Sequence, residues 1–279
     1  MKSSLASAPR QGLGTWTIGQ GRHPAATEVA ALHAGLDLGL CLIDTAEMYG
    51  EGRSERLVGQ ALASWLPLEP GAPRPWLVSK VLPNHASRQG VRRACEGSLR
   101  RLGLDRIDLY LLHWRGTHPL DGTVDAFEQL RAEGRIGHWG VSNFDVADME
   151  DLWAVPGGTH CAANQVLYNP ASRGIEFDLL PWCASRGVTV MAYCPLGHGD
   201  LVGHPLLAEI GARHRVSGTA VALAWAARSG AVIAVAESGD PQHVRDNAAA
   251  LQLRLDEADL AAIDALWPPP ERKAPLDML

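Results

Sequence analysis

Four polar side chains in the first half of the chain could together carry out acid–base chemistry. They are Asp44, Tyr49, Lys80 and His113, and each ends or closely follows a short apolar run. Tyrosine is a weak acid with a pKa of about 10, but a nearby ammonium group favours the phenolate and lowers that pKa. Asp44 would keep a buried Lys80 charged, and His113 could donate a hydrogen bond to a substrate oxygen. We interpret the set as a device for donating a proton to a carbonyl oxygen.

Taken singly, each of these residues has an ordinary structural interpretation: a helix cap, a packed loop residue, a strand-edge lysine or a satisfied core histidine. The combination favours chemistry. The sequence offers no accompanying nucleophile–base pair or set of metal ligands, so the electrons for a reduction would come from a nicotinamide cofactor. No metal site is expected, and three further histidines are interpreted as structural or surface residues: His138, His160 and His214.

The four residues can meet only if the strands that carry them lie side by side. Short apolar runs alternate with amphipathic helical patterns at residues 12–17, 41–44, 76–80, 107–113, 136–141, 162–166, 188–193 and 232–235. Strands that are apolar on both faces and separated by helices form a parallel sheet, and eight such units close a barrel. Neighbouring strands lie about 4.8 Å apart, so residues that close consecutive strands can touch. The predicted fold class is α/β, a (β/α)8 TIM barrel in which residues 1–279 form one domain.

The main competing fold is a doubly wound dinucleotide-binding domain. It would need GxGxxG at its first strand–helix turn, and the glycines between residues 12 and 21 lack that spacing. Helical patterns with 3.6-residue periodicity fall at residues 29–36, 57–65, 91–102, 244–251 and 256–266. Ser54, Ser87 and Asp240, the last followed by Pro241, are predicted helix N-caps.

The composition of the chain limits its possible partners and its cellular location. A net charge of −6, a pI near 6.0 and the lack of clustered Lys and Arg argue against nucleic acid as a partner. The five cysteines are scattered and never spaced as CxxC, which favours reduced thiols. Residues 1–10 do not resemble a signal peptide, and no apolar run approaches the roughly 20 residues that span a bilayer. We expect a soluble cytoplasmic protein without a membrane partner, either a monomer or a weak homo-oligomer.

At this point the sequence resembles the aldo-keto reductase family over about residues 12–266. The motifs that carry the resemblance are Gly14-Thr15-Trp16, Ile43-Asp44-Thr45-Ala46-Glu47-Met48-Tyr49-Gly50, Ser54-Glu55, Val78-Ser79-Lys80, Leu112-His113, Gly140-Val141-Ser142-Asn143-Phe144, Asn164-Gln165, and Ala192-Tyr193 with Pro195-Leu196-Gly197. The resemblance implies an NAD(P)H-dependent carbonyl reductase on a (β/α)8 barrel. In it Tyr49 would be the general acid, Lys80 and Asp44 would tune it, and His113 would orient the substrate carbonyl.

The same resemblance implies a set of binding residues. Ser142, Asn143 and Gln165 would hold the nicotinamide carboxamide while Tyr193 stacks on the ring. Other expected cofactor-binding residues, on matching motifs or positions, are Gly14, Thr15, Leu196, Glu237, Arg245 and Asn247. Trp16 and Trp114 would line the substrate pocket.

The chain departs from the family pattern where the cofactor's 2′-phosphate would lie. The family often carries Ile-Pro-Lys after the last strand, but this chain reads Val235-Ala236-Glu237. Two like charges about 4 Å apart at an effective dielectric of about 20 repel by roughly 4 kcal/mol. Arg245 and Asn247, at the family's adenosine-binding positions, pull the other way. We therefore expect NADP(H), with NAD(H) as a serious contender.

Two smaller departures are Cys194, where the family commonly has serine, and residues 1–11, which are too short for the family's complete N-terminal hairpin. The short tail, residues 267–279, predicts a pocket open on one side. The runs Leu112-His113-Trp114-Arg115-Gly116 and Leu276-Asp277-Met278-Leu279 resemble bacterial members that reduce methylglyoxal and other small aldehydes. The alternative is a redox-silent, nicotinamide-nucleotide-binding regulatory protein on the same barrel. A third possibility, a metal hydrolase on the same barrel, would need several His and acidic ligands at strand ends, and His113 alone does not meet that requirement.

Overall fold

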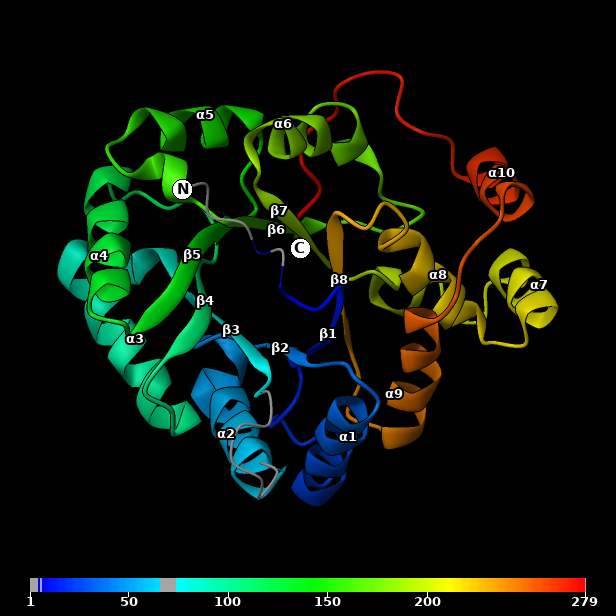
Figure 1. The fold of residues 1–279 in the computed structure, drawn as a ribbon, viewed down its shortest axis with the longest axis horizontal. Helices are drawn as coiled ribbons and strands as arrows, with labels where there is room; N and C mark the ends of the chain where they lie inside the picture. The colour runs from blue at the N-terminus through cyan, green and yellow to red at the C-terminus, as the bar shows by residue number, and fades with distance from the viewer. Residues whose placement is uncertain (1–4, 6, 66–73, 279) are drawn as a thin grey trace.

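The predicted barrel is confirmed. In the computed structural model, which describes residues 5, 7–65 and 74–278, parallel strands close into a barrel in the order β1-β2-β3-β4-β5-β6-β7-β8. The helices form a ring outside the strands (Figure 1). The strands are β1 (Gln11–Gly14), β2 (Leu42–Asp44), β3 (Trp76–Val81), β4 (Ile107–Leu112), β5 (Ile136–Ser142), β6 (Ala163–Leu167), β7 (Thr189–Tyr193) and β8 (Val232–Glu237). These bounds follow the eight predicted runs closely.

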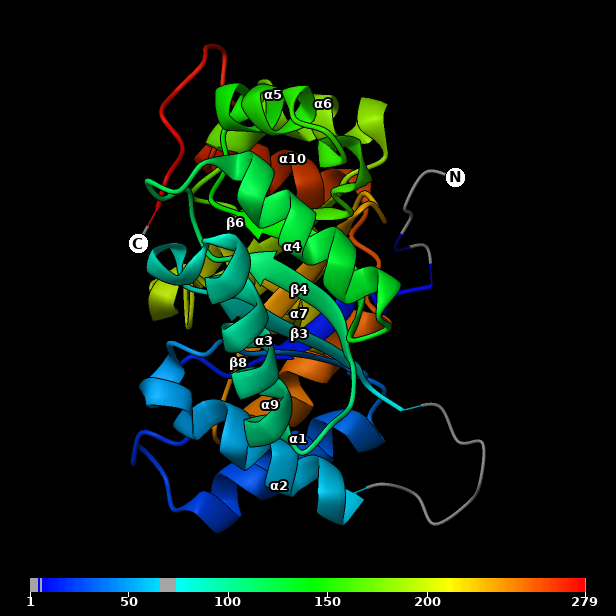
Figure 2. The same ribbon diagram turned by 90° about the vertical axis from the view of Figure 1, so that its left-hand side faces the viewer.

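The α-helices of the described residues alternate with the strands and cover the barrel from all sides, as the two views at right angles show (Figures 1 and 2). They are α1 (Ala25–Asp37), α2 (Arg53–Trp65), α3 (Arg88–Leu102), α4 (Leu120–Ala132), α5 (Val146–Ala154), α6 (Leu179–Arg186), α7 (Pro205–His214), α8 (Gly218–Ala226), α9 (Pro241–Ala248) and α10 (Glu257–Leu266). Short 3-10 turns interrupt the loops at η1 (Tyr49–Gly52), η2 (Pro83–His85), η3 (Gly158–His160), η4 (Gly174–Glu176), η5 (Gly197–Gly199) and η6 (Ala249–Leu251).

Two of the three predicted helix caps are confirmed. Ser87 caps α3 by accepting from the Gly90 amide, and Asp240 caps α9 by accepting from the Gln242 amide. Ser54 is not a cap. It is the second residue of α2 and is fully buried, and its hydroxyl donates to the Thr15 carbonyl at 2.9 Å. The prediction was wrong because η1 runs directly into α2, so the helix begins before the serine and its hydroxyl ties α2 to the loop after β1.

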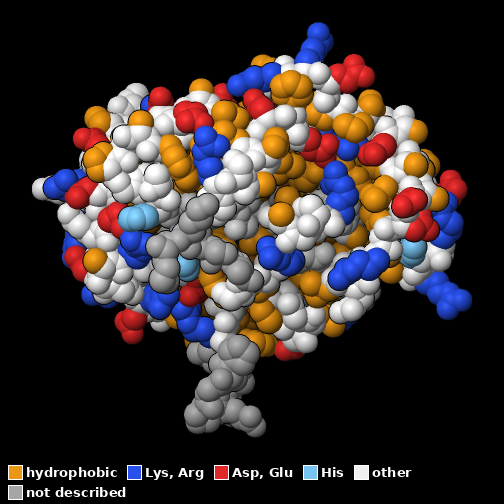
Figure 3. Space-filling model, turned by 45° about the horizontal axis from the view of Figure 1, so that its top comes forward, with side chains coloured by type: hydrophobic (Ala, Val, Ile, Leu, Met, Phe, Trp, Pro, Cys, Tyr) orange, Lys and Arg blue, Asp and Glu red, His pale blue; other side chains and the backbone are white. Residues whose placement is uncertain are grey.

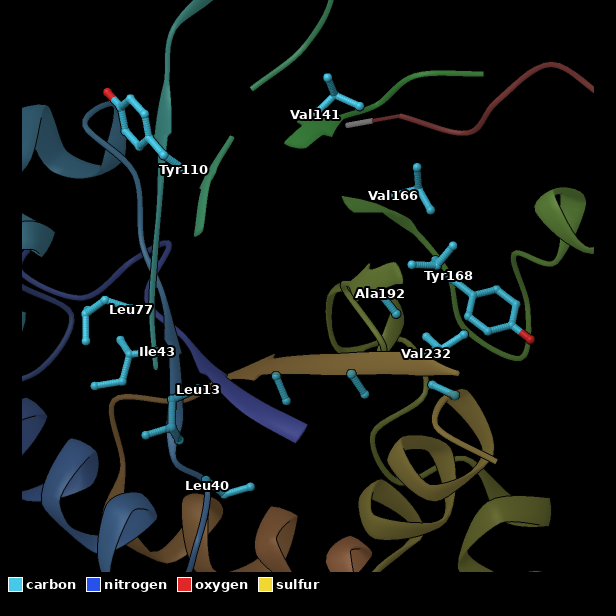
Figure 4. Packing of buried hydrophobic residues seen from close by; sticks show 14 of the residues in the cluster. Leu13, Leu40, Ile43, Leu77, Tyr110, Val141, Val166, Tyr168, Ala192 and Val232 are labelled. Carbon is cyan, nitrogen blue, oxygen red and sulfur yellow. The ribbon is translucent and has the colours of Figure 1, made fainter. Parts of the chain in front are cut away.

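Alternation along the strands divides the core into two layers. Side chains that point outward pack against the helices, among them Ile43, Leu77, Tyr110, Val141 and Val166 (Figure 4). Side chains of the second layer fill the barrel interior: Leu42, Val78, Leu109, Leu111, Ala163, Met191, Ile233 and Val235. Leu5 and Ala8 join this inner cluster. The expectation that residues 1–11 are too short for a complete N-terminal hairpin falls partly outside the described residues, so it stays a prediction.

The remaining expectations concern thiols and surfaces. All five cysteines are free; Cys95, Cys161 and Cys183 are buried, and Cys41 and Cys194 are half-buried. In the described part of the chain, no helix combines the length and apolar character needed to cross a membrane. On the face drawn in Figure 3, acidic and basic side chains are interspersed rather than segregated by sign.

Candidate active site

The buried pair of Asp44 and Lys80 lies at the centre of the site. Leu42 and Val78 face the barrel interior, and because side chains alternate along a strand, the residues two positions later face inward as well. Lys80 Nζ donates to Asp44 Oδ2 at 2.7 Å and to the Thr45 carbonyl at 3.0 Å. Lys80 is fully buried and Asp44 is 4% exposed. The ammonium group therefore sits in the barrel with a paired charge rather than in solvent.

Tyr49 reaches this pair from the loop after β2. The turn η1 passes through left-handed backbone at Gly50, Glu51 and Gly52, with φ values of 55°, 56° and 79°. Glycine adopts this backbone without strain, so two of the three positions suit it, whereas Glu51 adopts it at a cost. Lys80 Nζ donates to the Tyr49 hydroxyl oxygen at 3.2 Å. The phenolic proton is consequently available for another acceptor.

His113, directly after β4, completes the group. Its ring lies edge-on to Tyr49 with 5.7 Å between centroids, and 5.0 Å from the ring of Trp114. Burial, helped by the charge of Lys80, lowers the pKa of His113 to about 2. The imidazole is therefore neutral, with one nitrogen as donor and the other as acceptor. Its buried Nδ1 finds no hydrogen-bond partner among the described residues.

The pKa of Tyr49 differs from the sequence-based expectation. Burial raises this pKa well above 10, and the neighbouring Asp44, Cys194 and Glu237 raise it further. We expected Lys80 to lower it, but burial disfavours the phenolate more strongly than one ammonium group favours it. Burial also lowers the pKa of Lys80, against the opposing effect of Asp44. Tyr49 thus stays protonated at neutral pH, the form that a proton donor requires.

A bond across the barrel was missed by sequence reasoning. Gln165 Nε2, from the middle of β6, donates to Asp44 Oδ1 at 2.8 Å. Asp44 therefore accepts from Lys80 with one oxygen and from Gln165 with the other. Only the inward direction of both side chains in the closed barrel could have indicated this contact.

The predicted carboxamide-binding residues lie at the ends of β5 and β7 and in the middle of β6. The Ser142 hydroxyl donates to the Gln165 carbonyl at 2.8 Å, and the Tyr193 hydroxyl donates to Asn143 Oδ1 at 2.8 Å. Asn143 has left-handed backbone, with φ of 59°, and its Nδ2 approaches the His113 carbonyl at 3.3 Å. Hydroxyl and amide groups that donate and accept, beside a flat ring, have the chemistry that a nicotinamide carboxamide requires. These residues fit that group.

Glu237 ends β8 and points toward the same opening. Its carboxylate accepts a hydrogen bond from the Thr17 hydroxyl, which bridges the loops after β8 and β1. Its charge contributes to the raised pKa of both Tyr49 and Cys194. Burial also raises the pKa of Glu237 itself. Thr17 was not among the predicted site residues.

The aromatic rings and small residues of the rim are distributed over several loops. Trp16 is 43% exposed and meets the His198 ring edge-on at 5.5 Å, which links the loops after β1 and β7. Gly14 pairs with Glu237 in the register of β1 and β8. The Thr15 hydroxyl is buried and donates to the Asp44 carbonyl at 3.0 Å, and Leu196 is packed against the outer core.

The two predicted adenosine-binding residues are not side by side. Asn247 is 7% exposed, whereas Arg245 is exposed on the same helix, α9. Residues two apart in an α-helix point about 200° away from each other, because each residue turns the helix by about 100°. The structure therefore does not present Arg245 and Asn247 as one joint surface.

One further group of potential metal ligands lies among the described residues, at His214, Asp256 and Asp259. The Asp259 carboxylate already accepts from Arg213 and His214, each at 2.6 Å, and Asp256 caps α10. The group therefore joins α7 to α10 through ion pairs.

Comparisons with known proteins identify the family of the chain. Residues 11–268 match the model of the Aldo/keto reductase family. The chain is 48% identical to the methylglyoxal reductase YeaE of Escherichia coli (strain K12), over 99% of this chain and 97% of that protein. Among solved structures, an aldo-keto reductase from Klebsiella pneumoniae in complex with NADPH has a TM-score of 0.91 and 49% identity, covering 98% of this chain and 95% of that one. An aldo/keto reductase from Klebsiella pneumoniae in complex with NADP and acetate has a TM-score of 0.93 and 47% identity, covering 100% of both chains.

Proposed function

The chain belongs to the aldo/keto reductase family and is an NAD(P)H-dependent oxidoreductase, and from this premise we propose that it reduces aldehydes or ketones to alcohols with Tyr49 as the general acid. The observation that carries the proposal is the direction of one hydrogen bond. Lys80 Nζ donates to the Tyr49 oxygen at 3.2 Å, so the phenolic proton points away from the ammonium group and can pass to a substrate.

The residues of the site divide the work of proton donation. Tyr49 gives its proton to the carbonyl oxygen as negative charge develops there. Lys80, held by Asp44, stabilises the phenolate that remains, because an ammonium group beside it lowers the cost of the new charge. The neutral ring of His113 donates a hydrogen bond to the same substrate oxygen and fixes its approach.

A bound nicotinamide cofactor supplies the hydride that the carbonyl carbon receives. Ser142, Asn143 and Gln165 would hold its carboxamide, and Tyr193 would stack on its ring. Gly14, Thr15 and Leu196 would line the rest of the cofactor site. This assignment is supported by the fit of the hydroxyl and amide groups at the end of β5 and in the middle of β6 to an amide group.

For the choice of cofactor, we propose NADP(H) with weak discrimination against NAD(H). The NADPH and NADP complexes of the two Klebsiella pneumoniae relatives support the first part. The inward carboxylate of Glu237, tethered by Thr17, supports the second, because it would repel a 2′-phosphate nearby. A preference for NADPH of a thousandfold or more in kcat/KM would contradict this proposal.

The proposed substrates are small aldehydes such as methylglyoxal. The similarity to a methylglyoxal reductase over nearly the whole chain supports this class. Trp16 and Trp114 would form apolar walls of the pocket, since each lies at the carboxyl end of a strand with part of its ring uncovered. A kinetic comparison of methylglyoxal, an aromatic aldehyde and an aldose would rank the classes directly.

The substitution Tyr49→Phe tests the assignment of the acid. General acids typically contribute about 10²- to 10⁴-fold to rate, so kcat should fall by at least about a hundredfold while NADPH binding, followed by fluorescence, stays within about twofold. Tyr110→Phe is the matched control, because the Tyr110 side chain is fully buried but packs on the outer face of β4, away from the four residues of the site. Near-full activity of Tyr49→Phe would refute the assignment.

The same assay separates the second candidate, a redox-silent nucleotide-binding regulator. Such a protein would change cofactor fluorescence on binding but would consume no cofactor with any aldehyde in the panel.

A further inference from the structure

Glu55, in the Ser54-Glu55 motif, has no part in the proposed proton donation, yet its environment is unusual. It lies on α2, outside the barrel, and is fully buried. Its Oε1 accepts from the Ser79 hydroxyl at 2.6 Å, and its Oε2 accepts from Arg101 Nε at 2.5 Å. Arg101 is only half-buried, with 25% of its side chain exposed, so the full burial of the Glu55 carboxylate is the costly part of this ion pair. Such a pair is weak evidence for stability alone.

The Arg101 side chain extends to Glu55 alongside the turn that carries Tyr49. A Cβ atom placed on Gly52, the last residue of η1, would lie 2.5 Å from Arg101 Cδ and 2.7 Å from its Nε. A Cβ atom on Gly97 would lie 3.1 Å from Arg101 Nη1. The arginine therefore rests directly on the backbone of η1 and α3, where any larger residue would displace it.

The other partner of Glu55 connects the pair to Lys80. Ser79 and Lys80 are consecutive in β3, so their side chains point to opposite faces of the strand. Glu55 holds the outer face through Ser79 at the point where Lys80 enters the barrel. The charge of Glu55 also favours the ammonium form of Lys80, although burial and Asp44 act on that group more strongly.

Together these contacts act on the two elements that carry Tyr49 and Lys80. Arg101 braces η1, which begins with Tyr49, and Glu55 fastens β3, which carries Lys80. We propose that Glu55 and Arg101 are positioning residues that hold the Tyr49 hydroxyl at Lys80 Nζ. The inference rests on the proposed role of Tyr49 and concerns how that role is supported from outside the barrel.

The test uses Arg101→Met and the double variant Glu55→Gln/Arg101→Met. The double variant leaves no buried charge unpaired and guards against a loss of folding in the single one. A misplacement of about 1 Å can cost about a hundredfold in rate, so kcat with methylglyoxal should fall about 10- to 100-fold. KM and the Kd for NADPH should stay within about twofold, because neither residue faces the barrel opening. Arg100→Met, which removes the neighbouring exposed arginine, should leave all three constants unchanged.

A second readout does not depend on turnover. The chain has four tyrosines, so ¹³C-labelled tyrosine gives few ring signals, and Tyr49→Phe identifies the one from Tyr49. In both Arg101 variants this signal should shift, whereas in Arg100→Met it should not. An unshifted signal together with an unchanged kcat would overturn the positioning role. If the wild-type protein consumed no cofactor, the proposed function would fail, and the position of the Tyr49 signal alone would still decide the present inference.

Discussion

The carboxylate of Glu237 should set how strongly the enzyme discriminates between NADPH and NADH. Glu237→Gln is the sharpest perturbation, because the amide keeps the size of the side chain and an oxygen that can accept from Thr17. It removes only the charge. At about 4 Å and an effective dielectric of about 20, a carboxylate and one phosphate charge repel by roughly 4 kcal/mol, which corresponds to about a thousandfold.

Solvent screening reduces this value, since Glu237 is only partly buried. If about half of the repulsion remains, the variant should raise the ratio of kcat/KM for NADPH to that for NADH by about 30-fold. The assay is cofactor consumption with a saturating aldehyde at fixed ionic strength. Glu257→Gln, an exposed acid in the first turn of α10, controls for the change in net charge and should leave the ratio unchanged.

The same charge predicts how selectivity depends on pH. Burial raises the pKa of Glu237, so on lowering the pH the carboxylate becomes neutral earlier than an ordinary glutamate does. The wild-type protein should therefore shift toward NADPH as the pH falls, and this shift should be smaller in Glu237→Gln, in which only the phosphate titrates. A ratio that changes by less than about threefold in the variant, with the same pH dependence as the wild type, would refute our placement of Glu237 beside the 2′-phosphate.

Two further predictions concern stability. His113 has its pKa lowered to about 2 by burial, so the unfolded chain binds the extra proton as the pH falls below about 6.5. Between pH 6.5 and 5.5 this costs at most about 1.4 kcal/mol of unfolding free energy, and urea titrations of His113→Gln should show a correspondingly flatter acid slope; parallel slopes would argue against a neutral, buried imidazole. Gly140→Ala should lose about 1–3 kcal/mol because its Cβ would lie 2.4 Å from the Ala163 carbonyl, whereas Gly122→Ala, whose nearest neighbour is 4.0 Å away, should lose nothing; equal losses in urea titrations would contradict the packing of β5 against β6.

Much of the fold could be predicted because the pattern that marks a barrel strand lies within a few consecutive residues. A run such as Trp76–Val81 begins with apolar residues for both faces of the strand and carries its polar residues, Ser79 and Lys80, near its end. The caps at Ser87 and Asp240 are equally local, since each depends on an amide two or three residues away. Ser54 failed for the complementary reason: its partner, Thr15, is 39 residues away, and nothing near it in the sequence indicates that bond.

The contacts that tune the site were beyond sequence reasoning for the same physical reason. The bond from Gln165 to Asp44 joins residues 121 apart, and that from Thr17 to Glu237 joins residues 220 apart. Both exist only because the sheet closes on itself. The raised pKa of Tyr49 likewise depends mainly on burial, which the residue types around it do not reveal.

The shared carboxylate of Asp44 determines which substitutions can separate proton donation from cofactor binding. One oxygen accepts from Lys80, which supports the proposed proton donor Tyr49. The other accepts from Gln165, which belongs to the proposed carboxamide-binding residues. Truncating Gln165 would leave Asp44 Oδ1 without its donor, and a buried acceptor without a partner perturbs its neighbours. A loss of activity in such a variant would therefore mix both effects. Ser142 is the cleaner probe of the carboxamide side, because its hydroxyl bonds the Gln165 backbone carbonyl and the Asn143 amide rather than Asp44.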